Sequence, residues 1–61
     1  MSRLPRLLSV RRVHEETDLP LSTVYDLVAK GDLPAIRNGR SVRIDERDLL
    51  RWIDSRRETV R

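Results

Sequence analysis

The sequence predicts a small, mainly α-helical domain with one two-stranded β-hairpin. Three observations predict this fold class: two short segments with helical apolar spacing, an Asn-Gly pair flanked by strand-like residues, and a third helical segment that opens on an aspartate. With 61 residues, the chain makes a single domain near the lower limit for independent folding. We expect an ordered core over about residues 7–57 and frayed ends.

The first helix is predicted over about Val10 to Thr17. Ser9 is a good N-cap, because its hydroxyl can accept a hydrogen bond from a free amide of the first turn. Leu8 precedes this cap and Val13 lies four residues into the helix, which is the spacing of a hydrophobic staple. The pair is expected to fix the angle at which the chain enters the helix.

The second helix is predicted over about Pro20 to Lys30. A proline is tolerated at a helix start because the first amides lack partners, and Gly31 supplies the left-handed residue that ends the helix. Its buried stripe has the spacing i, i+3, i+4: Val24, Leu27 and Val28. Because the break at residues 18–20 is so short, the two helices must cross, as in a helix-turn-helix.

The hairpin is predicted around Asn38-Gly39, a pair that favours a type I′ turn. The flanking segments, Leu33 to Ile36 and Val42 to Ile44, have the alternating character of short strands. Residues 37–43 contain three arginines and no acid. A basic hairpin after two crossed helices is typical of the wing of a winged helix-turn-helix, although the same arginines could simply keep a hairpin soluble.

The last helix is predicted to open at Asp45. Asp48 follows three residues later, which gives a capping-box-like pair of acids near the helix N-terminus. The apolar stripe that follows comprises Leu49, Trp52 and Ile53, with Leu50 at its margin. A lone Trp at helical spacing is expected in the core rather than as a stacking platform for bases.

The composition excludes several classes of protein. The chain has no Cys and one His, so it offers neither disulfides nor a zinc site, and we expect no metal or other cofactor. No nucleophile–base set or phosphate-binding glycine loop indicates an enzyme. No apolar run approaches the roughly 20 residues of a membrane span, and no signal peptide is evident. These features predict a soluble, cytoplasmic protein.

The net charge of +3 is modest but unevenly distributed. Arginines crowd the N-terminal segment: Arg3, Arg6, Arg11 and Arg12. The next stretch is acidic, with only Lys30 opposing its carboxylates, and the hairpin is purely basic. All but one of the 13 basic residues are Arg, which suits phosphate and guanine recognition, although a GC-rich genome would encode the same bias.

The surface that would face DNA follows from the buried stripe of the second helix. The residues left to project outward are Leu21, Ser22, Thr23, Tyr25, Asp26 and Lys30. In a helix-turn-helix, the second helix reaches base edges in the major groove while the first crosses the backbone. Asp26 would repel phosphate, so we expect it to brace a nearby Arg or, alternatively, to accept a hydrogen bond from cytosine.

Several short motifs occur in a characteristic order between about Leu7 and Arg57. They are Leu8-Ser9-Val10, Ser22-Thr23-Val24-Tyr25, Gly31-Asp32-Leu33-Pro34-Ala35, Arg37, Gly39-Arg40, Arg43-Ile44, Asp48-Leu49 and Trp52-Ile53. Together they resemble the small excisionase-family DNA-binding domain. That family belongs to the MerR-like winged-helix group and includes phage recombination directionality factors.

The resemblance implies roles for residues at matching positions. Ser22, Thr23 and Tyr25 would contact DNA from the recognition helix. The wing would comprise Arg37, Asn38, Gly39, Arg40 and Arg43, with Arg40 in or beside the minor groove. Ser9, Arg11 and Arg12 of the first helix would lie near the backbone. Four residues depart from the usual pattern: Arg12, His14, Leu21 and Asp26; we expect His14 to pack at the helix crossing.

The resemblance also implies a function. Such proteins bind double-stranded DNA near a phage attachment site, bend it, and direct an integrase, here expected to be a tyrosine recombinase, toward excision in the bacterial host's nucleoid. Bending costs on the order of 1–6 kcal/mol, so several copies in a head-to-tail array are expected. Ile36 and residues 56–61 are candidate contact surfaces, but equally an ordinary exposed side chain and a frayed end. No membrane or small-molecule ligand is expected.

Two other functions remain open. The nearest is a small MerR-like transcriptional regulator that uses the same domain, although such regulators usually continue into a long dimerisation helix. The other is a protein-interaction module whose basic wing meets an acidic partner. A DNA binder is distinguished from such a module by salt-dependent affinity, because each neutralised phosphate adds about −0.9 to the log–log slope.

Overall fold

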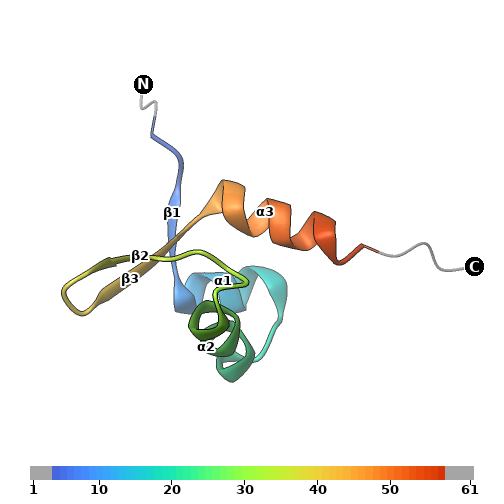
Figure 1. The fold of residues 1–61 in the computed structure, drawn as a ribbon, viewed down its shortest axis with the longest axis horizontal. Helices are drawn as coiled ribbons and strands as arrows, with labels where there is room; N and C mark the ends of the chain where they lie inside the picture. The colour runs from blue at the N-terminus through green and yellow to red at the C-terminus, as the bar shows by residue number, and fades with distance from the viewer. Residues whose placement is uncertain (1–3, 58–61) are drawn as a thin grey trace, which may run out of the picture.

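The computed structural model describes residues 4–57, which form three helices and a small antiparallel sheet (Figure 1). Listed in chain order, the elements are β1 (Leu7–Ser9), α1 (Val10–Thr17), α2 (Leu21–Lys30), β2 (Ile36–Asn38), β3 (Ser41–Asp45) and α3 (Glu46–Ser55). The hairpin of β2 and β3 projects away from the helices (Figure 1). This arrangement confirms the winged helix-turn-helix fold. No helix in the described part of the chain is long and apolar enough to cross a membrane.

The sheet has three strands in the order β1-β3-β2, so the expectation of a two-stranded sheet is incomplete. β1 pairs with β3 in the register Leu8↔Ile44 and Ser9↔Arg43. The pairing continues one step further, because the Glu46 N–H donates to the Arg6 carbonyl over 3.0 Å. The segment before α1 is therefore part of the sheet and joins the wing to the first helix.

The core lies between the sheet and the helices. Its buried residues are Leu8, Val10, Val13, Val24, Leu27, Leu33, Ile44 and Leu49. The stripes expected on α2 and α3 are confirmed, with Val28, Trp52 and Ile53 half-buried against this cluster. Leu50, placed at the margin of its stripe, is 57% exposed. Leu8 and Val13 both belong to the core, as a hydrophobic staple requires.

Hydrogen bonds hold the tight connection between α1 and α2. The Ser9 hydroxyl caps α1 by accepting from the Arg12 N–H over 3.0 Å, and α1 ends at Asp18, whose φ of 61° is left-handed. The Thr17 hydroxyl donates to the Val13 carbonyl (2.6 Å), and His14 Nδ1 donates to the Leu19 carbonyl (2.6 Å). His14 therefore lies at the helix crossing, as expected. α2 begins at Leu21, one residue later than expected, with Pro20 at the N-cap.

The two glycines end one element and turn another. Gly31 stops α2 with a φ of 85°, and its N–H donates to the Val28 carbonyl over 3.1 Å. The hairpin turn differs from the type I′ turn expected around Asn38-Gly39. Asn38 pairs with Ser41, so Gly39 and Arg40 are the central residues, and only Gly39 has a positive φ (62°). A glycine first and an ordinary residue second is the pattern of a type II′ turn.

Asp45 ends β3 and caps α3. Its carboxylate accepts from the Arg47 N–H (2.8 Å) and from the Arg47 guanidinium at Nε (3.2 Å) and Nη2 (2.8 Å). These bonds, first from the side chain and then from the backbone of Arg47, hold the pKa of Asp45 below its ordinary value. Asp48 lies in the first turn of α3, as the expected pair of acids requires, and its carboxylate pairs with Arg51.

Candidate nucleic-acid interface

A groove of about 390 Å³ lies between the start of α1, the exposed face of α2 and the wing. We call it the wing groove. Its lining residues are Ser9, Val10, Arg11, Tyr25, Arg40, Ser41, Val42 and Arg43. The groove thus brings together residues from all three groups expected at a DNA interface: the first helix, the recognition helix and the wing.

The sheet positions the basic residues of this groove. Arg43 lies on the central strand, opposite Ser9 of β1 and Ile36 of β2. Its Nη1 donates to the Val42 carbonyl over 3.0 Å. Arg40 occupies the second central position of the turn, where the side chain is exposed. Because β3 is paired on both sides, the backbone that carries the Arg43 side chain is held in place.

Tyr25 and Arg11 reach the groove from the two helices. Tyr25 follows the fully buried Val24 on α2 and is 57% exposed. Arg11 is exposed in the first turn of α1, where the Ser9 cap fixes the backbone. Guanidinium groups and a phenol hydroxyl can all donate hydrogen bonds to phosphate oxygens. The groove therefore has the chemistry of a site for a polyanionic backbone.

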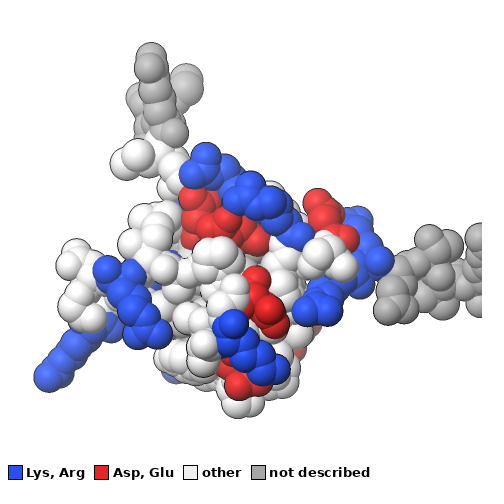
Figure 2. Space-filling view, in the orientation of Figure 1, with Lys and Arg blue, Asp and Glu red and all other residues white. Residues whose placement is uncertain are grey.

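In the described structure the arginines of the wing groove form no ion pairs, whereas several basic residues elsewhere do. Among residues 4–57, the ion pairs join Arg12–Glu16, Lys30–Asp26, Arg47–Asp45, Arg51–Asp48 and Arg57–Asp54. The arginines of that range outside these pairs are Arg6, Arg11, Arg37, Arg40, Arg43 and Arg56. Figure 2 shows the consequence: the wing carries only basic colour, whereas acidic and basic side chains mix over the helices. A positive, uncompensated surface attracts a polyanion.

Most of the residues that we expected to face DNA from α2 lie outside the wing groove. Ser22 is exposed and Thr23 half-buried, but neither lines the wing groove. Leu21, expected to face outward, instead packs half-buried against the core, because it lies at the first turn next to the helix connection. Of this set, the structure brings only Tyr25 into the groove.

Asp26 does not brace an arginine. Its Oδ2 lies 3.4 Å from Lys30 Nζ, one turn along α2, and both side chains are more than half exposed. The i,i+4 spacing puts the two residues on one face of the helix, which explains the pairing. The expected bracing role of Asp26 is therefore wrong for the described residues, and Lys30 shares its charge with that carboxylate.

The remaining expected residues lie beside the groove. Arg37 and Asn38 are exposed on β2, and Gly39 forms the turn. Arg12 does not line the groove; it faces a neighbouring hollow and pairs with Glu16 at 3.8 Å. Ser41 lines the groove although sequence reasoning missed it; its position two residues before Arg43, on the same face of a strand, was the available signal.

The described residues contain no group of three or more His, Cys, Asp or Glu side chains arranged to hold a metal ion.

The family model described as "Helix-turn-helix domain" matches residues 7–57 of this chain. The chain belongs to this family. It is a family of excisionase-like DNA-binding proteins, which agrees with the chemistry of the wing groove. The matched range begins at β1 and covers every element of the helix-turn-helix domain, including the wing and α3.

The chain is also similar to "Uncharacterized protein YvgK" of Bacillus subtilis (strain 168), with 60% identity over 30 residues. The match spans 49% of this chain and 10% of that protein. No solved structure matches the chain significantly.

Proposed function

We propose that this helix-turn-helix domain binds double-stranded DNA in a sequence-specific manner. The recognition helix α2 enters the major groove, and the wing lies along the adjacent minor groove with Arg40 at its tip. The observation that carries the proposal is the wing groove, where Arg11, Arg40 and Arg43 come from separate elements and none has an acidic partner in the described structure. DNA phosphates supply the negative partners that these arginines lack.

We further propose an excisionase-type role for the protein. Several copies would bind adjacent sites near a phage attachment site, bend the DNA and direct a tyrosine-recombinase integrase toward excision, in the cytoplasm of the bacterial host and associated with its nucleoid. The resemblance to the MerR-like excisionase group supports this role. Neither catalysis nor a cofactor is required, because the protein acts by shaping DNA.

Contacts between copies are proposed at Ile36. This side chain is 49% exposed on the edge strand β2, beside the central Arg43. An exposed apolar residue next to the wing groove is placed to meet a neighbouring copy on the same DNA. Arg56 and Arg57 form the described part of the other candidate surface, and residues 58–61 lie outside the described residues. Replacing Ile36 by Asp should abolish cooperativity. Ile36→Asn should also abolish it but, because it adds no carboxylate opposite Arg43, should leave the affinity for a single site unchanged.

The alternative is a small transcriptional regulator with the same domain. Selection of bound fragments from a random duplex pool at near-physiological salt separates the two functions. Tandem direct repeats about one helical turn apart support a head-to-tail array, whereas inverted repeats support a symmetric dimeric regulator. A pool without any enriched motif contradicts sequence-specific binding.

A further inference from the structure

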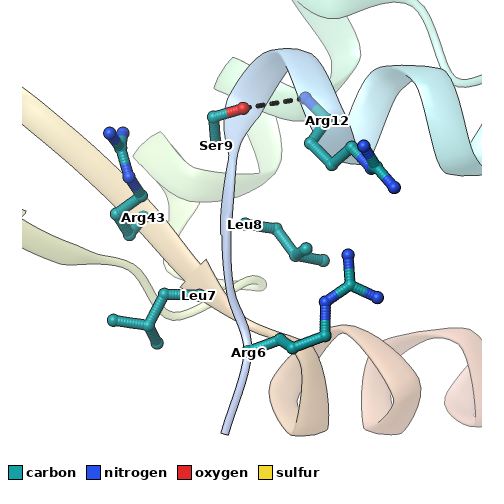
Figure 3. Close-up of a pocket in the computed structure, with 6 residues that line it drawn as sticks. All are labelled: Arg6, Leu7, Leu8, Ser9, Arg12 and Arg43. Atoms are coloured by element: carbon teal, nitrogen blue, oxygen red, sulfur yellow. Dashed lines mark hydrogen bonds between the residues drawn. The ribbon is translucent and has the colours of Figure 1, made fainter.

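A second hollow, of about 340 Å³, adjoins the wing groove. Its lining residues are Arg6, Leu7, Leu8, Ser9, Arg12 and Arg43 (Figure 3). Ser9 and Arg43 line both hollows, and they are directly paired across β1 and β3. The two hollows therefore form one continuous basic path that runs from the wing, past the start of α1, to the segment before β1.

The second hollow contains Arg6, which lies outside the wing groove. Figure 3 shows Arg6 and Arg12 on one side of β1, with their guanidinium groups pointing into the same space. Arg43 lies on the other side of the strand (Figure 3). Two guanidinium groups that point into one space repel each other, and an anion that binds between them relieves this repulsion.

We propose that Arg6 and Arg12 bind one phosphate of the DNA backbone, next to the stretch held by the wing groove. This inference rests on the proposed function, since the ligand is the flanking phosphodiester of the same duplex. It adds Arg6 and the β1 side of the fold to the DNA-binding surface. The protein then contacts the backbone on both sides of the Ser9–Arg43 pair.

The backbones of both arginines are anchored. The Arg6 N–H donates to Glu46 Oε1 (3.3 Å), while the Arg6 carbonyl accepts from the Glu46 N–H (3.0 Å). The Arg12 N–H is held by the Ser9 hydroxyl at 3.0 Å. Anchored backbones reduce the conformational entropy lost when the side chains close on a phosphate.

Two carboxylates compete for these arginines. Arg12 Nε lies 3.8 Å from Glu16 Oε1, but both side chains are about half exposed, so the pair is weak and easily exchanged for a phosphate. Glu16 and Glu46 also line an apolar hollow together with Arg6. No ion pair joins Arg6 to either of them in the described structure. The alternative is that Arg6 has a purely structural role between Glu16 and Glu46. The following experiment distinguishes this role from phosphate binding.

The test compares Arg6→Gln with Arg51→Gln. Both changes remove one positive charge from an exposed arginine, but Arg51 lies on α3, outside both hollows, and pairs with Asp48. Affinity for a fluorescein-labelled duplex recovered by selection is measured by anisotropy from 50 to 200 mM salt. Loss of one phosphate contact should make the log–log slope shallower by about 0.9, so Arg6→Gln should lose about threefold more affinity at 50 mM than at 200 mM, relative to wild type. Arg51→Gln should keep the wild-type slope.

Neutral methylphosphonates placed one at a time along the same duplex locate the contact. At one flanking position the substitution should weaken wild-type binding, cost less in Arg6→Gln and in Arg12→Gln, and cost nothing further in the double variant. The inference is overturned if Arg6→Gln keeps the wild-type slope while Arg43→Gln loses affinity, an outcome that leaves DNA binding itself intact. A lower melting temperature for Arg6→Gln without any change of slope likewise overturns it in favour of the structural role. Failure of the wild-type protein to bind any duplex would overturn the proposed function too.

Discussion

Asp45 is the residue on which a strand and a helix both depend. It ends β3, caps α3 and accepts three hydrogen bonds from Arg47 while only 9% exposed. Acids near a helix N-terminus are favoured by the free amides and by the helix dipole. Sequence alone predicted the cap, since Asp before an apolar stripe is a common start signal. It could not predict the Arg47 pairing, because that depends on the side-chain conformation of a neighbour that is itself exposed.

The lowered pKa of Asp45 predicts acid sensitivity. Because its pKa is lower in the folded protein than in the unfolded chain, Asp45 contributes stability that is fully present above about pH 5 and is lost as pH falls below about 4, through the folded pKa. The difference in free energy of unfolding between wild type and Asp45→Asn should therefore be constant from pH 7 to 5 and shrink below pH 4. Urea unfolding followed by the fluorescence of Trp52 measures it. A difference that is unchanged down to pH 2.5 would contradict the assignment.

Asp26 gives a prediction at the same scale. Its carboxylate lies on the exposed face of α2 and offsets the charge of Lys30. Asp26→Asn should therefore raise affinity for duplex DNA by about two- to threefold at 100 mM salt, equally for different sequences, because one repulsive charge is removed and Lys30 is released. Loss of the i,i+4 pair should cost only about 0.3–0.5 kcal/mol of stability. Weaker binding, or a change of sequence preference, would restore a role in base recognition.

At the scale of elements, the wing depends on β1 as much as on its own turn. β3 is paired on both sides, so the wing is anchored to the segment that caps α1. The sequence predicted α1 with the observed bounds, because its cap and staple are local signals. It did not predict β1, a strand of three residues without readable alternation whose partner Ile44 lies far along the chain. Because β1 was not predicted, the sequence did not indicate that Arg6 and Arg12 lie on the same side of that strand (Figure 3).

The turn of the wing can be tested through its glycine. Gly39→Ala places a side chain at a φ of 62°, and nothing lies within 4 Å of the added Cβ, so the cost is backbone strain of about 1 kcal/mol. Gly31→Ala, at a φ of 85° and equally open, is the matched control on the helix end. Both variants should lower the free energy of unfolding by similar amounts in thermal or urea melts. Only Gly39→Ala should weaken DNA binding, and equal affinities would argue against a role for the wing.

For the whole molecule, a small core leaves little stability in reserve. Domains of this length have a total stability of only a few kcal/mol, and Ile44 at the centre of the sheet is fully buried. Ile44→Ala should cost about 2–5 kcal/mol and unfold most of the population at 25 °C, as measured by circular dichroism. Ile36→Ala removes the same atoms from a residue of the neighbouring strand that is 49% exposed, and should stay within about 1 kcal/mol of wild type. A folded Ile44→Ala variant would show that the core extends beyond these contacts.

The sequence predicts the surface of the molecule less completely than it predicts the core. The arginines of the wing and of the first helix were expected at the DNA interface, and the fold brings Arg11, Arg40 and Arg43 to one groove. Composition could not show which cations are neutralised by ion pairs. Lys30 was expected at the interface and proves to be paired with Asp26, because helical spacing places an acid beside it.

The proposed binding of DNA phosphates in the wing groove is tested by the salt dependence of binding to the selected duplex. Wild-type protein is compared with the double variant Arg40→Gln/Arg43→Gln. Three groove arginines on three phosphates predict a log–log slope of about −2.7 or steeper for wild type, and a slope shallower by about 1.8 for the double variant. A flat slope, or equal slopes for the two proteins, would contradict it.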